Sequence, residues 1–171
     1  MTELSNDDDI DLTHIIVKPL YFGLLVNVTV PLVLLFIIYY VKSRSAGVNH
    51  VGDNAQFFLY AFGALALLQT LAIVWWRDKL FKAPMIHRRE TFEADFGAEY
   101  LKRCKPLFLA IAALSFWGFL FYFLTGRFQE SAIFVIVSYL VFQIVRPRHG
   151  LVRRLIIRQR QLVEQGEFLR D

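Results

Sequence analysis

The sequence predicts an all-α integral membrane protein with four transmembrane helices. Four hydrophobic stretches of 23, 23, 21 and 15 residues contain no Asp, Glu, Lys or Arg, and hydrophobic residues make up 56% of the chain. A bilayer core of about 30 Å needs ~20 apolar residues in a helix, so three stretches are long enough to cross and the fourth is short. Because four spans and their connections occupy most of the 171 residues, we expect one domain, 1–171.

The first two spans are expected to form a hairpin. The first span, about 19–41, is predicted to begin at Pro19, whose missing N–H costs nothing in the first helical turn. The second span, about 55–76, returns to the starting side and ends on Trp75 and Trp76, which suit a membrane interface. The third span opens like the first, and this similarity fits either a duplicated hairpin or convergence.

Small residues predict where neighbouring helices approach closely, because they let two backbones come together. In the second span, Gly63, Ala66 and Thr70 fall on one helical face. The fourth span, about 131–145, is short and must draw flanking residues into the interface or thin the bilayer. The third span, about 106–126, collects small residues in its first half: Ala110, Ala112, Ala113, Ser115 and Gly118.

Basic residues divide unevenly between the connections. If the N-terminal segment 1–18, the middle loop 77–105 and the tail 146–171 share one side, that side carries 16 Lys and Arg residues and the other carries 3. The positive-inside rule then places both termini and the middle loop in the cytosol, in a bacterial inner membrane or an equivalent one. The net charge of +4 is explained by insertion and by attraction to anionic lipid, so we expect no nucleic-acid partner. The N-terminal segment is acidic, with Glu3, Asp7, Asp8, Asp9 and Asp11.

Two amphipathic helices are expected on the cytosolic side. In the middle loop, Phe92, Phe96 and Tyr100 recur every four residues, which predicts a short helix along the membrane or beneath the bundle. The tail predicts a basic helix that lies in the headgroup plane, or one that docks on a partner or on the chain's own middle loop. Its apolar face comprises Leu151, Val152, Leu155, Ile156, Leu162 and Val163.

Two sets of residues are candidates for specific contacts. Inside the spans, Asn27, Gln69 and Gln143 are polar, and such residues usually make one interhelical hydrogen bond. Asn27 lies four residues before Pro31, so its carbonyl is expected to lack its helical partner. The second set is expected to contact lipid or a partner protein and comprises the tail arginines Arg146, Arg148, Arg153, Arg154, Arg158 and Arg160.

The cysteine, the histidines and the sequence motifs give no indication of a metal site, and we expect no cofactor and no catalytic residue. The single cysteine, Cys104, cannot form an internal disulfide. No Gly-rich phosphate loop and no nucleophile elbow occur in the sequence. The histidines lack the i, i+3 or i, i+4 spacing of a helical metal site; they are His14, His50, His87 and His149.

One short string resembles a segment of an enzyme family. Asp95-Phe96-Gly97-Ala98-Glu99-Tyr100, followed by a basic stretch and Pro106, resembles the Phe-Gly-x-Glu-Tyr segment of isoprenylcysteine-type membrane methyltransferases. In that family the segment follows the main spans and an Arg-His-Pro motif. Here it precedes two spans, and the nearest analogue, Arg148-His149-Gly150, lies downstream. The resemblance implies a methyltransferase relative, but it carries no catalytic residue over to this chain.

The absence of ionisable residues from the spans favours a non-catalytic role, because proton and ion pathways usually need them. We expect a multi-pass accessory or assembly subunit of a larger membrane complex, in contact with lipid and with other membrane subunits or copies of itself. Its basic cytosolic face would serve for docking or lipid binding. The alternative is a small oligomeric transporter or channel for a neutral solute, lined by Asn27, Gln69, Ser138 and Gln143.

Overall fold

The computed structural model describes residues 12–44 and 54–169, and they form helices joined by short connections. None of these residues lies in a β-strand. The predicted acidic segment falls mostly in 1–11, outside the described residues. A short 3₁₀ helix, η2 (Arg89–Thr91), precedes α3. The α-helices are α1 (Leu12–Arg44), α2 (Ala55–Lys82), α3 (Phe92–Ala112), α4 (Leu114–Thr125), α5 (Phe128–Val145) and α6 (His149–Glu164).

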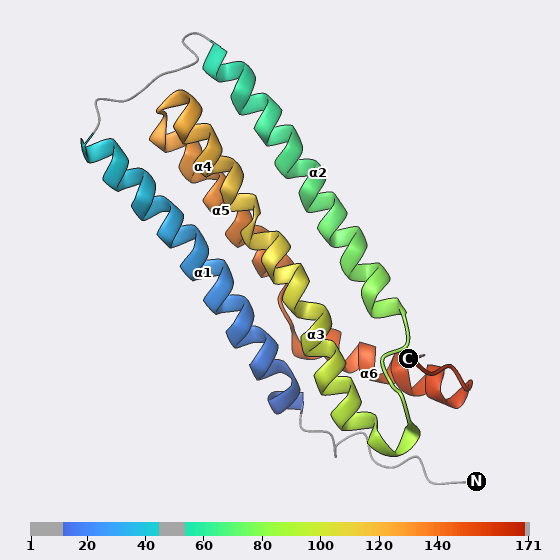
Figure 1. The fold of residues 1–171 in the computed structure, drawn as a ribbon. Helices are drawn as coiled ribbons and strands as arrows, with labels where there is room; N and C mark the ends of the chain where they lie inside the picture. The colour runs from blue at the N-terminus through green and yellow to red at the C-terminus, as the bar shows by residue number, and fades with distance from the viewer. Residues whose placement is uncertain (1–11, 45–53, 170–171) are drawn as a thin grey trace.

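Four helical segments are long and apolar enough to cross a membrane, so the predicted fold class is confirmed. They are α1, α2, the combined α3–α4 segment and α5. The third segment covers Arg89–Thr125 and is far longer than a bilayer core requires. Its first part therefore extends beyond the apolar layer, at the end of the bundle that also carries α6 (Figure 1). We refer to this end as the α6 end.

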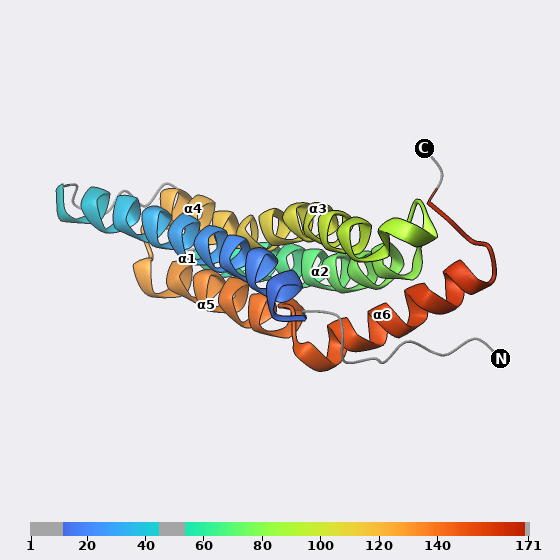
Figure 2. The ribbon, with the colours of Figure 1, turned by 90° about the horizontal axis from the view of Figure 1, so that it is seen from below.

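The third spanning segment, α3 with α4, lies between α1 and α2 (Figure 1). Helix α1 packs against α3 and α5, whereas α2 packs mainly against α4. The two arms of the first hairpin are therefore not a packed pair. Helix α6 is set at an angle to the four long segments and leaves the end of α5 as an arm (Figure 2).

Two predicted helix boundaries are wrong. Helix α1 begins at Leu12, so Pro19 lies inside the helix and not at its start. The separate short helix predicted in the middle loop is the first part of α3, which runs without interruption from Phe92 past Pro106. The physical reason is that charged residues mark where lipid ends, not where helical hydrogen bonding ends. The helix continues because it has an apolar face to bury, and Phe96 and Tyr100 are 0% and 2% exposed.

Close helix packing occurs at Gly118 and not at the glycine of the second span. A Cβ atom on Gly118 would overlap the backbone oxygen of Ser131 and lie 3.0 Å from the Cβ of Phe134, so α4 and α5 meet with no room for a side chain. A Cβ atom on Gly63 would meet nothing within 4 Å. The stripe predicted on the second span thus touches a neighbour only in part, since Ala66 is buried.

Candidate functional site

The third spanning segment is interrupted at Ala113, in the middle of its apolar part. The backbone N–H of Phe116 bonds to the carbonyl of Ala113, three residues back, at 3.1 Å. Helix α3 ends at Ala112 and α4 begins at Leu114, so the regular series of i, i+4 hydrogen bonds is broken here. Side-chain donors to the carbonyls of residues 110–112 stabilise such a break in an apolar environment.

Three side chains supply those donors, one for each carbonyl. Gln69 of α2 donates from Nε2 to the carbonyl of Ala110 at 2.9 Å. Ser138 of α5 donates to the carbonyl of Ile111 at 2.8 Å. Ser115 donates to the carbonyl of Ala112 at 2.6 Å.

A fourth residue completes this arrangement, because the indole N–H of Trp117 donates to Oε1 of Gln69 at 2.7 Å. Gln69 thus bonds simultaneously to the residues on both sides of the break. We call Gln69, Ser115, Trp117 and Ser138 the break cluster. The break cluster joins α2 and α5 to the third segment at the break between α3 and α4. Its polar groups therefore serve the packing of the bundle.

The other two predicted intramembrane residues do not bridge helices. Asn27 is 2% exposed, and its Nδ2 donates to the carbonyl of Gly23 in its own helix at 3.0 Å. Its Oδ1 is buried and has no partner among the described residues. The side chain of Gln143 makes no hydrogen bond within residues 12–44 and 54–169. The backbone carbonyl of Gln143 accepts a bond from the guanidinium of Arg148 at 2.9 Å.

The tail arginines lie on and beside α6, on the side away from its buried face. Arg146, Arg148, Arg153, Arg154 and Arg158 are exposed, whereas Arg160 is half-buried with its guanidinium 5.9 Å from the ring centre of Phe92. The opposite face is covered by the chain itself, with Val152, Leu155 and Ile156 buried in the same core as Met85 and Ile86. One face of α6 is therefore packed on residues of the middle loop.

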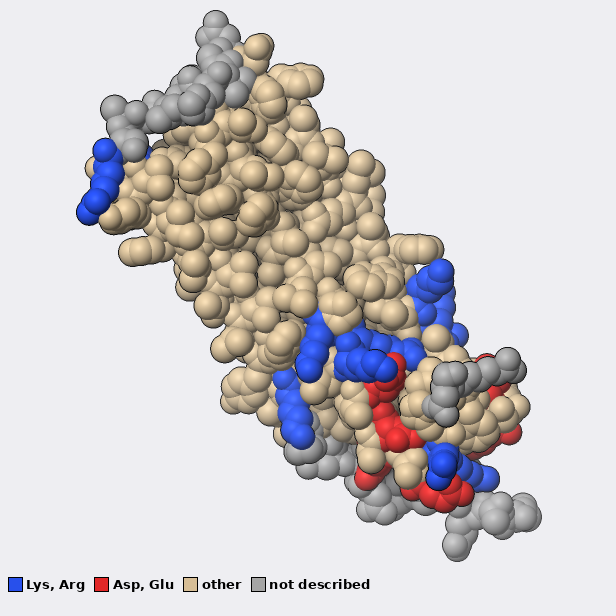
Figure 3. All heavy atoms as spheres, viewed as in Figure 1, with Lys and Arg blue, Asp and Glu red and all other residues tan. Residues whose placement is uncertain are grey.

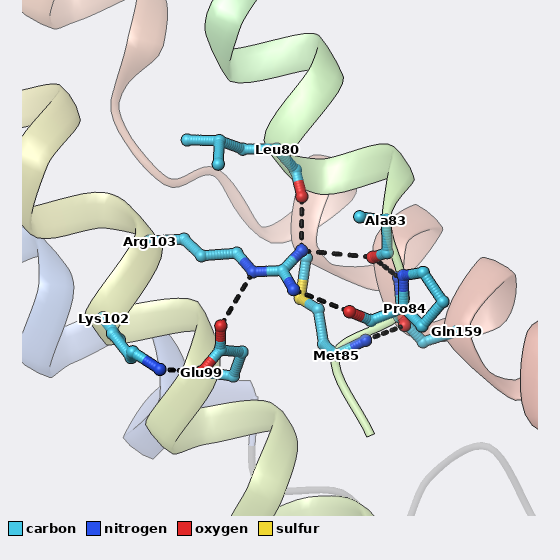
Figure 4. A network of polar contacts seen from close by, with 8 residues as sticks. All are labelled: Leu80, Ala83, Pro84, Met85, Glu99, Lys102, Arg103 and Gln159. Atoms are coloured by element: carbon cyan, nitrogen blue, oxygen red, sulfur yellow. Dashed lines mark hydrogen bonds and ion pairs between the residues drawn. The ribbon is translucent and has the colours of Figure 1, made fainter. Parts of the chain in front are cut away.

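The middle loop is held by Arg103, a residue that the sequence presents only as one of many basic charges. Its side chain is 9% exposed and pairs with Glu99 at 3.0 Å. The guanidinium also donates to the carbonyls of Leu80, Ala83 and Pro84, with the Ala83 bond at 3.1 Å and the Pro84 bond at 2.6 Å (Figure 4). One planar group on α3 therefore binds three carbonyls at and beyond the end of α2.

Gln159 of α6 binds the same stretch from the other side. Its Nε2 donates to the carbonyl of Ala83 at 3.1 Å, and its Oε1 accepts from the N–H of Met85 at 2.9 Å (Figure 4). Gln159 is 0% exposed, and its bond to Met85 is buried. Together Arg103 and Gln159 connect α2, α3 and α6. We call these two residues and Glu99 the loop clamp.

The start of α3 adds a further restraint on the middle loop. The carboxylate of Asp95 accepts hydrogen bonds from the hydroxyl of Thr91 at 2.8 Å and from the N–H of His87 at 3.1 Å. The Thr91 bond is the main reason that the pKa of Asp95 lies below its ordinary value. Asp95 lies outside the apolar part of the third segment, in the charged region before Lys105.

The string that resembles the methyltransferase segment lies in the first part of α3. Phe96 and Tyr100 are buried, and their rings stack 5.7 Å apart. Glu99 is held by Arg103 and by Lys102, the latter at 3.3 Å. In this string, Phe96 and Tyr100 thus contribute to the packing of the bundle and Glu99 belongs to the loop clamp. Among the described residues, no group of three or more His, Cys, Asp or Glu is placed to hold a metal ion.

Comparisons of the chain with protein-family models, with curated proteins and with solved structures return no match.

Proposed function

We propose that the protein is a non-catalytic multi-pass membrane subunit that associates laterally with another membrane protein through α2. The observation that carries this proposal is the exposure of α2. Only 11% of the most apolar 18-residue stretch of α2 is buried inside the protein. The corresponding fractions are 28% for α1, 50% for the α3–α4 segment and 33% for α5. Its exposed large side chains include Phe57, Tyr60, Leu67, Leu68, Leu71 and Trp75.

The polar groups inside the bundle support a role at the surface. The break cluster uses its donors on backbone carbonyls, and the hydroxyls of Thr125 and Ser131 bond to carbonyls of their own helix turns at 2.8 Å. Among described residues, these bonds leave few polar groups free to line a path for a solute. A helix whose outer face is aromatic and unpacked is instead suited to a neighbouring apolar helix.

The distribution of charge supports a defined orientation of this subunit. On the face drawn in Figure 3, charged residues gather at the α6 end, and the surface between the two ends is almost free of them. With the α6 end in the cytosol, the basic residues satisfy the positive-inside rule. The exposed arginines of α6 then face anionic headgroups or a partner's acidic surface, in keeping with the proposed role.

Site-specific photocrosslinking in native membranes tests the proposal. A photoreactive residue replaces Leu68 on α2, which is 62% exposed, or Ile136 on α5, which is 57% exposed and serves as the matched control. We expect a discrete protein adduct from position 68 and only lipid adducts from position 136. Lipid adducts alone from position 68, or equal protein adducts from both positions, would contradict lateral association through α2.

One observation favours a second function, the transport of a neutral solute. The Oδ1 atom of Asn27 is buried with no hydrogen-bond partner in the described part of the chain, and a solute hydroxyl or amide could donate to it. Proteoliposomes should then admit an uncharged solute such as glycerol faster than empty liposomes, and Asn27→Leu should remove the difference. Uptake equal to that of empty liposomes would exclude glycerol as the solute and weaken this second function.

A further inference from the structure

A groove lies between the end of α2 and the middle of α3, beside the loop clamp. Its volume is ≈ 720 Å³. The lining combines an aromatic pair with charged side chains, namely Trp75, Trp76, Lys79, Glu99, Lys102 and Arg103. Three cationic side chains thus face one carboxylate, so the groove has an excess of positive charge.

The excess charge resides on the two lysines. Arg103 already donates four hydrogen bonds, one to Glu99 and three to backbone carbonyls. Glu99 is shared between Arg103 and Lys102. Lys79 makes no ion pair with a described residue, and its Nζ lies 5.2 Å from the ring centre of Trp75. An anion entering the groove therefore meets two ammonium groups that are not fully neutralised.

The groove sits at the boundary between the apolar surface and the charged end. Lys79 follows the charge-free stretch of α2, and Lys102 precedes that of the third segment. Figure 3 shows Lys and Arg gathering where the uncharged surface ends. Trp75 is 65% exposed, as expected for an aromatic residue at the headgroup level. Towards the apolar side, α2 continues with Leu71, which is 59% exposed and can accommodate an acyl chain.

We propose that this groove is a binding site for an anionic phospholipid. Lys79 and Lys102 contact the phosphate, the Trp75–Trp76 pair flanks the headgroup, and an acyl chain follows α2 past Leu71. Basic pockets between transmembrane helices at the headgroup level recognise such lipids through the same chemistry. The site is separate from the α6 arginines, and it shares Trp75 and Leu71 with the exposed face of α2 proposed above for lateral association.

The test uses the purified full chain in a neutral detergent, titrated with dioleoyl phosphatidylglycerol and monitored by native mass spectrometry. Dioleoyl phosphatidylcholine and inorganic phosphate are the two comparison ligands. The variant Lys79→Ala/Lys102→Ala is expected to bind phosphatidylglycerol about 30-fold more weakly, from the contribution of two basic residues near a lipid surface. The matched control Arg88→Ala/Arg89→Ala removes two exposed arginines of the middle loop at the same end and should retain the wild-type affinity.

Three results would overturn the proposal. Undiminished binding of phosphatidylglycerol by the lysine variant would show that the groove is not the site. An equal loss in the arginine control would show diffuse attraction to the whole basic end. Competition by inorganic phosphate at concentrations similar to those of the lipid would show a site for a free anion. Equal melting temperatures of wild type and variant without added lipid show that the lysine substitutions leave the fold intact.

Discussion

Replacing Arg103 with methionine tests the loop clamp at its centre. Arg103→Met preserves a long apolar stem and removes the guanidinium, so packing changes little while four donated bonds are lost. In this variant, the carbonyl of Ala83 still accepts a hydrogen bond from Gln159, and Glu99 still forms its ion pair with Lys102. The carbonyls of Leu80 and Pro84 lose the donor that the structure gives them.

The expected cost is about 3 kcal/mol of unfolding free energy, at the lower end of the range for breaking a buried ion pair by removing one partner. The lower end applies because the neighbouring groove admits water to the exposed side of the loop. Arg103→Lys should recover less than half of the loss, since a point charge cannot reach a carboxylate and three carbonyls at once.

Unfolding in mixed micelles of neutral detergent and dodecyl sulfate, followed by circular dichroism at a helical wavelength, measures this cost. The matched control is Lys102→Met, because Lys102 is 77% exposed and its pair with Glu99 should contribute no more than about 0.5 kcal/mol. Limited trypsin digestion gives a second measurement, since Arg103→Met should speed cleavage in the middle loop near Arg88. If Arg103→Met costs no more stability than Lys102→Met, the loop clamp does not stabilise the fold.

The remaining predictions concern packing, the break cluster and orientation. Gly118→Ala should lower the free energy of unfolding by ~1–3 kcal/mol because the added Cβ would meet the backbone of α5. Gly63→Ala should change it by less than about 0.5 kcal/mol, and the same unfolding assay distinguishes the two variants. Gln69→Leu should cost about 1 kcal/mol through the loss of two bonds, and Gln143→Leu close to nothing; equal effects would refute a specific role for the break cluster. Reporter tags at the two termini should both be cytosolic in a membrane-topology assay, and tags on opposite sides would contradict the assigned orientation.

The number of spanning segments could be predicted from the sequence, but not how far α1, α2 and α3 extend beyond the apolar layer. Charge-free runs report the thickness of the apolar layer, because charged side chains avoid lipid. Helix ends depend on what the chain packs against outside that layer. The stacked residues Phe92, Phe96 and Tyr100 were visible as a stripe, and this stripe extends a spanning helix instead of forming a separate one.

The polar sites were predictable only as a list of residues. Gln69 stood out as a polar side chain within a span, but the break that it serves lies at Ala113, and neither glycine nor proline marks that position. Arg103 could not be distinguished from the other basic residues of the middle loop. Its one local signal was Glu99 at i−4, which predicts an ion pair but not the three carbonyls. Those carbonyls come from a segment about 20 residues earlier, so their position depends on the tertiary fold.

The proposal that the protein works as a subunit is tested most directly by the composition of the particle that it forms in its own membrane. Extraction into a polymer-bounded lipid disc, followed by mass determination of the intact particle and its released chains, gives this composition without detergent. We expect a second protein species, or more than one copy of this chain, in each particle. A particle that contains a single copy of this chain and lipid alone would contradict the proposed function.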